Sequence, residues 1–243
     1  MLNTDSEKIK ENNIAGYWGG QWIHNWPAYP DRTIGLLGVA INSLGKSHLV
    51  KIRTHLLALD DQDRFMRFGY TTTDEHIDRY IASLNFERDD IYGIFNTSME
   101  LAGLAHLALP KNLKNDQAEF GVSVLKKYRG KGYGNKLFER ASIHATNNKI
   151  KHIYIQALSE NGPMLKIARK HGAIIHREGS ETEALVSLAK PSIDSHMSEL
   201  ISEQYAKTNY DVRAEIKKFW DFMTDVQKLN KGVNTGRHKS SAD

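Results

Sequence analysis

Cysteine is missing from this sequence of 243 residues, which excludes disulfide bonds, thiolate metal sites and cysteine nucleophiles. Long hydrophobic runs are missing too, because the longest, residues 35–41, is far too short to cross a bilayer. Residues 1–13 are polar and contain no apolar core of a signal peptide. These absences lead us to expect a cytoplasmic protein that does not engage a membrane.

Charge is only mildly unbalanced, with 33 basic and 29 acidic side chains and a net charge of +4. Much of the excess lies near residue 130 and in the last residues, so a small polyanion explains it as well as nucleic acid would. No RNA- or DNA-binding motif accompanies the charge, and no histidines have metal-ligand spacing such as HxxxH. We therefore expect neither a nucleic-acid partner nor a metal.

Residues 122–137 pass from a predicted strand through a basic, glycine-rich loop into a predicted helix. A tight glycine turn points several backbone N–H groups at one spot, and the first helical turn adds its own N–H groups and the positive end of its dipole. The sequence therefore predicts an anion site suited to a pyrophosphate. The residues expected to form it are Arg129, Gly130, Lys131, Gly132, Tyr133, Gly134 and Asn135.

The glycine spacing in this loop separates it from two common phosphate loops. Neither the GxGxxG nor the GxxxxGK[ST] pattern is present. Instead, Arg129-x-x-Gly132-x-Gly134 resembles the R/Q-x-x-G-x-G/A motif of the GCN5-related N-acetyltransferases (GNAT family). The resemblance implies that the loop holds the pyrophosphate of acetyl-CoA, which would be the co-substrate.

The other predicted elements follow an order that fits the same family. We expect strands at 48–59, 91–96, 101–109, 117–125, 152–158, 173–176 and 184–188, with helices starting near 60, 74, 135 and 164. Thr73 is expected to cap the second helix. This order resembles the GNAT fold, an α+β (α/β/α) architecture around a mixed, mostly antiparallel central sheet.

The resemblance to the GNAT family extends from about Lys51 to Lys190. Three segments, 63–68, 118–120 and 160–164, are similar to the catalytic domain of bacterial Pat-type protein lysine acetyltransferases. The anion loop falls between the last two segments, as it does in that group. The resemblance therefore implies a GNAT acetyltransferase domain over 48–190.

Two extensions flank this predicted domain. The first, 1–47, is aromatic and glycine-rich, and its residues 14–32 either cover the domain surface or form an aromatic wall beside an acceptor amine. The second, 191–243, is expected to form two helical pieces and a disordered basic end from residue 231. Its Val212, Ile216, Phe219, Met223 and Val226 have the 4-3-4-3 spacing of a packing seam. We expect the seam to dock on its own domain, with a homodimer as the alternative.

Acetyl transfer requires a neutral amine, although a lysine-like amine has a pKa near 10 in water. A carboxylate can take the proton directly or through water. The Pat-type resemblance implies that Glu119, on the strand before the loop, is this general base. His106, on the neighbouring strand, is a second catalytic candidate that could help the proton leave.

The thioester carbonyl can be polarised by a backbone N–H, and family members splay two strands where this occurs. Val122 and Val124 are therefore expected to bind the pantetheine through their main chain. Asn161 resembles the family asparagine that contacts the cofactor arm, and it also suits a helix N-cap. Ala168 occupies the position of the tyrosine that protonates the leaving thiolate in many relatives, so the thiolate would leave unprotonated or take a proton from water.

The leading hypothesis is an acetyl-CoA-dependent N-acetyltransferase acting on a primary amine. The acceptor is either a protein lysine, which the Pat-like segments favour, or a small amine such as a polyamine or aminoglycoside. A non-catalytic acyl-CoA-binding regulator is the alternative of a different class.

Overall fold

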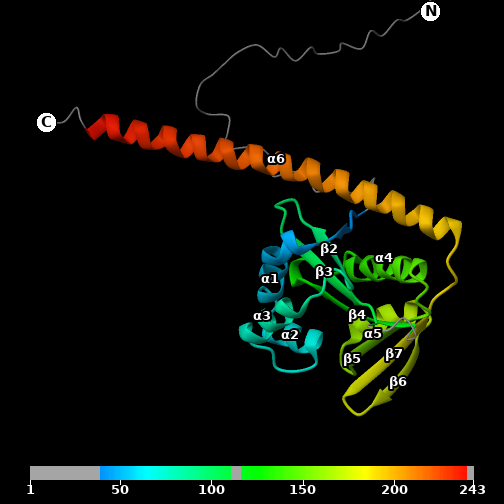
Figure 1. Ribbon diagram of the computed structural model, residues 1–243. Helices are drawn as coiled ribbons and strands as arrows, with labels where there is room; N and C mark the ends of the chain where they lie inside the picture. Colours follow the sequence, from blue (N-terminus) through cyan, green and yellow to red (C-terminus); the bar gives the residue numbers. More distant parts are fainter. Residues whose placement is uncertain (1–38, 111–115, 240–243) are drawn as a thin grey trace, which may run out of the picture.

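A seven-stranded sheet forms the centre of the computed structural model, which describes residues 39–110 and 116–239 (Figure 1). The strand order is β1-β2-β3-β4-β5-β7-β6. Neighbouring strands are antiparallel except β4 and β5, which are parallel. The strands are β1 Asn42–Ser43, β2 Asp90–Phe95, β3 Leu101–Ala108, β4 Gln117–Val124, β5 His152–Leu158, β6 Ile174–Glu178 and β7 Glu181–Ser187. The mixed, mostly antiparallel sheet of the predicted fold class is confirmed.

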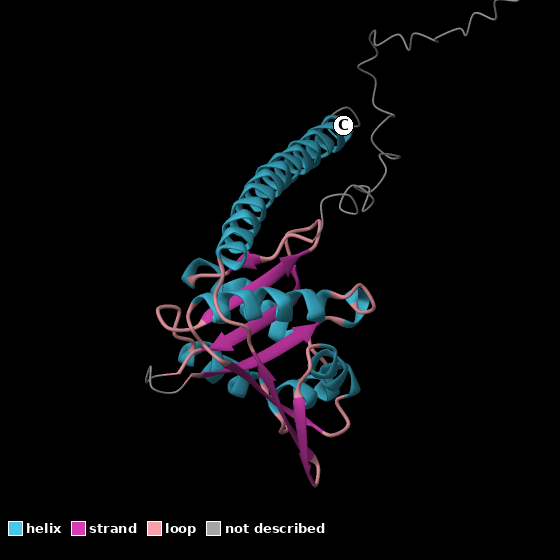
Figure 2. Ribbon diagram, turned by 90° about the vertical axis from the view of Figure 1, so that its right-hand side faces the viewer, coloured by secondary structure: helices cyan, strands magenta, loops and turns pink. Residues whose placement is uncertain are grey.

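Helices cover both faces of this sheet, so the domain has three layers (Figure 2). The helices are α1 Leu49–Leu57, α2 Asp61–Phe68, α3 Asp74–Ser83, α4 Tyr133–Asn147, α5 Gly162–Lys170 and α6 Ile193–Lys239. One apolar core joins α4 and α5 to the sheet, where the Phe120 ring packs edge-on against Phe138. The other core joins α1 and α3 to β2 and β3, around Ile52, Leu56 and Ile77. The sheet therefore has apolar packing on both faces.

The strand predicted at 48–59 is wrong, because this segment is helix α1. Its buried apolar side chains Ile52, Leu56 and Leu59 recur every three to four residues, which is the helical period. The first strand of the sheet is instead β1, which pairs with β2. Strand β1 lies within 1–47, the segment predicted to be the N-terminal extension. The aromatic stretch 14–32 lies outside the described residues.

The remaining predicted elements of the domain are confirmed in type, with small shifts of their ends. The predicted hairpin is β2 and β3, and the strand at 152–158 is β5. Thr73 caps α3, since its Oγ1 accepts a hydrogen bond from the His76 N–H at 3.4 Å.

The C-terminal segment differs from the prediction because it is one helix of 47 residues, α6, rather than two pieces. Its backbone is helical to Lys239, so the disorder expected from residue 231 is wrong for 231–239, and 240–243 lie outside the described residues. The predicted docking of the seam on its own domain is wrong for two of its residues, and the side chains of Met223 and Val226 lie outside the described ones. Val212 is 54% exposed and Phe219 is 57% exposed.

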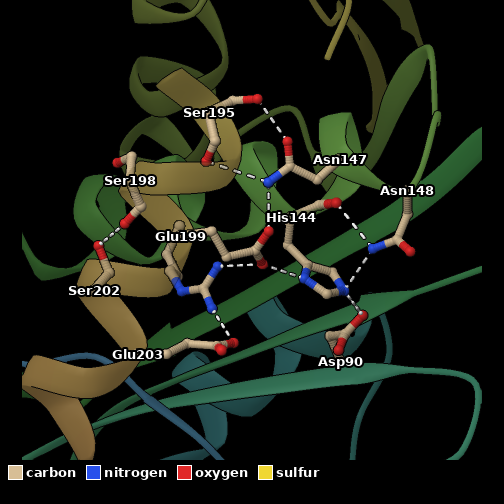
Figure 3. Close-up of polar contacts among 10 residues, drawn as sticks. Asp90, His144, Asn147, Asn148, Ser195, Ser198, Glu199, Ser202 and Glu203 are labelled. Carbon is tan, nitrogen blue, oxygen red and sulfur yellow. Dashed lines mark hydrogen bonds and ion pairs between the residues drawn. The ribbon is translucent and has the colours of Figure 1, made fainter. Parts of the chain in front are cut away.

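The first half of α6 is fixed to α4 and β2 by a polar cluster (Figure 3). The Glu199 carboxylate accepts hydrogen bonds from the guanidinium of buried Arg140 at 2.9 Å, from His144 Nδ1 at 2.5 Å and from the Asn147 amide. On its other side, His144 Nε2 lies 2.8 Å from Asp90 Oδ2. Burial alone would raise the pKa of Glu199, but these hydrogen bonds outweigh it and lower the pKa to about 2. This carboxylate therefore stays charged under ordinary conditions.

Within 39–110 and 116–239, no helix has the length and apolar character needed to cross a bilayer. Over the same residues, no group of three or more His, Asp or Glu side chains is arranged to hold a metal ion.

Candidate active site

Strands β4 and β5 are paired only at their first residues and then separate. The pairs are Gln117 with His152, Ala118 with Ile153 and Glu119 with Tyr154. Beyond Glu119, β4 continues to Val124 beside β3 alone, and β5 continues to Leu158 beside β7 alone. The sheet therefore opens directly after Glu119, as the predicted splay requires.

The main chain of Val122 and Val124 is directed toward this opening. The Leu125 N–H donates to the Ala102 carbonyl at 3.1 Å, on the β3 side. Because successive residues of a strand direct their N–H and C=O groups to opposite edges, those of Val124 and Val122 face away from β3. The Arg129 Nε confirms this direction, since it donates to the Val124 carbonyl at 3.0 Å. Both residues can thus offer backbone N–H groups to an extended ligand.

The predicted anion loop lies between this strand and α4. Gly130 and Gly132 have φ of 77° and 75°, a left-handed conformation that favours glycine. A Cβ atom at either position would meet nothing within 4 Å, so open space lies above the backbone there. Gly132 is the N-cap of α4 and provides no capping side chain, which leaves the first N–H groups of the helix for an anion. The loop thus has the open, uncapped backbone that an anion site requires.

Other predicted loop residues have contacts that shape the loop. The Arg129 guanidinium forms an ion pair with Asp63 of α2 at 2.7 Å, which fastens the loop to the helix layer. The Asn135 side chain donates to Glu139 and accepts from His171. Its backbone N–H, in the first turn of α4, is therefore the group that it can offer to an anion. A Cβ at Gly134 would lie 3.0 Å from Ile167 Cδ1, so this glycine lets α4 approach α5 closely.

The two remaining loop side chains have different surroundings. Tyr133 is partly buried against the core that joins α4 to the sheet. The Lys131 ammonium is 5.8 Å from the centroid of the Tyr128 ring. Lys131 is therefore placed at the loop surface, where a cation can screen an anion.

Asn161 begins α5 and joins it to α2. Its Oδ1 accepts from the Met164 N–H at 3.2 Å, so the predicted N-cap role is confirmed. Its Nδ2 donates to the Met66 carbonyl at 3.1 Å, across the opening between the two helices. This bridge places Asn161 beside the cavity described next.

A cavity of about 390 Å³ lies at the point where β4 and β5 separate. Its lining residues are Met66, Arg67, Phe68, Gly69, Tyr70, Tyr80, Glu119, Phe120, Gly121, Val122, Gln156, Ala157, Leu158, Asn161, Met164 and Glu181. Glu119 and Glu181 are exposed at its rim, and Tyr70 is 52% exposed. Carboxylates at such a rim attract a cationic amine.

His106 does not line this cavity. Its Nδ1 lies 2.8 Å from the Tyr80 hydroxyl, and its Nε2 lies 3.4 Å from Asp89 Oδ2 without good hydrogen-bond geometry. Burial and the nearby Arg67 charge lower the pKa of His106, against the opposing effect of Asp89. The structure thus places His106 behind Tyr80, one residue removed from the cavity.

Arg67 and Tyr80 line the cavity but were not among the predicted site residues. Arg67 lay within the segment 63–68, so the resemblance contained a signal for it. The sequence contains no such signal for Tyr80, because its spacing is that of a residue on the apolar face of α3. Only the packing of α3 on the sheet directs its hydroxyl toward the cavity.

Comparison with known proteins agrees with this geometry. The family model of the acetyltransferase (GNAT) domain matches residues 49–174, which is more than half of the chain. No curated protein matches the sequence.

Solved structures share the fold at low sequence identity. The GNAT domain of S. lividans PAT is similar with a TM-score of 0.53 and 16% identity, covering 61% of this chain and 89% of that one. A putative acetyltransferase from Acinetobacter baylyi has a TM-score of 0.50 and 14% identity over 63% of this chain and 95% of its own. An acetyltransferase of the GNAT family from Staphylococcus aureus has a TM-score of 0.50 and 14% identity, over 63% of this chain and 100% of its own.

Proposed function

The chain belongs to the GNAT family of acetyl-CoA-dependent N-acetyltransferases, and we propose that it acetylates the side-chain amine of a protein lysine, with Glu119 as the general base. The observation that carries this proposal is the convergence of three segments on one cavity. Residues 63–68, 118–120 and 160–164, which resemble the Pat-type enzymes, each contribute to its lining. The similarity in fold to the GNAT domain of S. lividans PAT agrees with this choice.

The anion loop and the open strand support the binding of acetyl-CoA in this proposal. The amides of residues 129–135 would hold the diphosphate, because the α4 N-terminus has no side-chain cap and the dipole favours negative charge. The main chain of Val122 and Val124 would pair with the pantetheine arm along the unpaired edge of β4. The thioester would then lie beside Gly121 and Val122, close to Glu119.

Glu119 is suited to accept the amine proton by its place at the rim. It is exposed, so it can act through a water molecule as well as directly. It shares the rim with Glu181, whose carboxylate accepts from Gln156 at 3.3 Å. Two carboxylates at the entrance favour a lysine ammonium on approach. The ammonium loses its first proton to water, and Glu119 takes the second as the neutral amine attacks.

The exposed rim also favours an acceptor presented by another protein. A lysine side chain on a protein surface can reach the cavity without being enclosed, since Tyr70, Glu119 and Glu181 are all exposed. A small amine such as a polyamine shares the positive charge and is the second acceptor class.

The test is turnover with labelled acetyl-CoA, comparing lysine-rich proteins and peptides with polyamines. For Glu119→Gln we expect a loss in kcat of about 100-fold, because a positioned general base contributes on that scale. Calorimetric affinity for acetyl-CoA should stay unchanged, since the substitution leaves the anion loop intact.

Glu178→Gln is the matched control, because Glu178 is an exposed glutamate of β6 that does not line the cavity. Equal turnover by the Glu119 and Glu178 variants would remove Glu119 as the base. A preference for polyamines over every lysine-containing protein would assign the small-amine acceptor instead.

A further inference from the structure

Arg67, in the last turn of α2, lies directly against the open part of β4. A Cβ atom on Gly121 would be 2.6 Å from the Cζ of its guanidinium, so the guanidinium occupies the space that a side chain at this position would take. Gly121 follows the last residues at which β4 pairs with β5. The guanidinium therefore covers the stretch of strand beside which the proposed thioester would lie.

A chain of polar groups fixes the orientation of this guanidinium. Arg67 Nη2 lies 3.2 Å from the Tyr80 hydroxyl. Because a guanidinium can only donate, the Tyr80 oxygen accepts, and its own proton is donated to His106 Nδ1 at 2.8 Å. His106 then carries its proton on Nε2, which lies 3.4 Å from the buried carboxylate of Asp89 without hydrogen-bond geometry. One direction of donation thus runs from Arg67 through Tyr80 to His106.

Aromatic rings hold the same group from its sides. The Arg67 Cζ is 5.1 Å from the centroid of the Phe68 ring and 5.7 Å from that of the Tyr80 ring. Asp89 is anchored in turn by Arg88, at 2.6 Å, and by the Leu109 N–H. The position of Arg67 is therefore determined by packing and hydrogen bonds rather than by solvent.

The charge of Arg67 is not neutralised by an ion pair in the described part of the chain. Among the residues that the structure describes, none forms an ion pair with its guanidinium, although most other arginines of α1, α2 and β4 to α4 are paired. A half-buried cation without a counter-ion favours any negative charge that forms beside it. The neighbouring reaction generates such a charge.

We propose that the Arg67 guanidinium stabilises the oxyanion that forms on the thioester carbonyl during acetyl transfer, an inference that rests on the proposed function. The amine nitrogen forms a bond to the carbonyl carbon, and the carbonyl electron pair moves onto oxygen beside Arg67. The amine proton passes to Glu119. When the carbonyl re-forms, the C–S bond breaks, and the sulfur leaves with its electron pair and takes a proton from water.

Arg67 donates hydrogen bonds to the oxygen in this scheme and transfers no proton. Tyr80, His106 and Asp89 are positioning residues, because they hold the guanidinium and do not touch the reacting atoms. This assigns His106 a role in the site that differs from direct proton transfer.

The experiment compares Arg67→Ala with Arg53→Gln in the full chain, using the best lysine-containing acceptor. Arg53 is the matched control, since it is an exposed arginine of α1 paired with Asp78. Arg67→Ala should lose about 100-fold in kcat, on the scale of losing one oxyanion donor, while the affinity for acetyl-CoA is unchanged. Added ethylguanidine should restore part of the kcat, which a loss of folding would not allow.

Tyr80→Phe is the second variant, and it should lower kcat by about 10-fold because it releases the guanidinium without removing it. If Arg67→Ala has the same kcat as an active wild type, the inference about Arg67 is overturned and the proposed function is not. An effect confined to the KM of acceptors that carry a carboxylate would also overturn the inference, because Arg67 would then bind the acceptor. Wild-type protein that transfers acetyl to no amine would overturn the proposed function, and the inference with it.

Discussion

His55 shows how a single buried residue ties α1 to the strand that opens. Its Nδ1 donates to the Leu101 carbonyl at 2.8 Å, and its Nε2 lies 2.9 Å from the Ser123 hydroxyl. Ser123 stands between the two valines expected to bind the pantetheine. Burial lowers the pKa of His55 to about 4 from the ordinary value of 6.5, and the nearby Arg67 adds to this effect.

This shift predicts how stability depends on pH. Between pH 6.5 and 4 the unfolded chain binds a proton at His55 that the folded chain does not, so the free energy of unfolding falls as pH falls. At about 1.4 kcal/mol per pKa unit, the full loss is about 3 kcal/mol. Urea titrations at several pH values should show a smaller pH dependence for His55→Asn than for wild type.

The same substitution at His176, an exposed histidine of β6, is the control. The comparison between variants matters because His144 acts in the opposite sense. Burial would lower its pKa, but Asp90 and Glu199 raise it overall. Its contribution is therefore complete below pH 6.5 and is lost as pH rises through the raised value. Identical slopes for His55→Asn and wild type would show that His55 does not carry the effect.

Among single residues, the glycines of the anion loop could be predicted from the sequence, whereas the role of Arg67 could not. Gly130 and Gly132 adopt positive φ, which their identity alone suggests. Arg67 and Gly121 are 54 positions apart, and nothing local to either predicts that they touch. Contacts made by tertiary packing are thus the part of the site that sequence patterns miss.

Among the elements, the beginning of α6 is held to α4 by a charge cluster. The carboxylate of Glu199 serves Arg140, His144 and Asn147 together, and Arg140 is only 4% exposed (Figure 3). Tyr92 supports the guanidinium at 5.0 Å from its ring centroid. Removing the carboxylate would leave a buried cation without its partner.

Glu199→Ala should therefore release the first half of α6 from α4. We expect a destabilisation of about 3 kcal/mol, the scale for breaking a buried ion pair. Hydrogen exchange should become faster in the amides of α6 up to about residue 210. Glu215→Ala is the control, since Glu215 is exposed and pairs only with Lys218 among the interactions described. Unchanged exchange in the Glu199 variant would mean that other contacts hold the helix.

The elements that sequence reasoning misassigned have physical explanations. Leu56 and Leu57 at the end of α1 form an apolar pair that suits a strand as well as a helix, and the 3-4 spacing of the buried positions decides for helix. Strand β1 has two residues, which is too short for any alternation to be visible. The predicted division of the C-terminal segment into two helices is not caused by a proline, because the one proline of this segment, Pro191, comes before α6.

For the whole molecule, the projecting half of α6 is the feature that the domain does not explain. Figure 1 shows this helix continuing past the sheet and its covering helices. The side that faces the domain includes Ala206, whose carbonyl accepts from the buried Asn42 side chain at 2.9 Å, and Tyr210, which packs on Phe95. Val212 and Phe219, the two exposed residues of the predicted seam, lie on a different side by the helical period. Helices of this length are stable mainly through packing of an apolar face.

The binding partner that best matches this seam is α6 of a second copy of the chain. A 4-3-4-3 apolar spacing is matched by another helix of the same spacing, and an identical α6 supplies it in a two-stranded pair. We predict a dimer in sedimentation equilibrium. The double variant Val212→Glu and Phe219→Glu should be a monomer, because each charge would be buried in the pair without a partner.

Lys207→Glu is the control, since this exposed residue lies outside the seam. Acetyl transfer should persist in the monomer, because no cavity residue belongs to α6. A wild-type monomer at every concentration, or a dimer that tolerates both charges, would rule out this pairing.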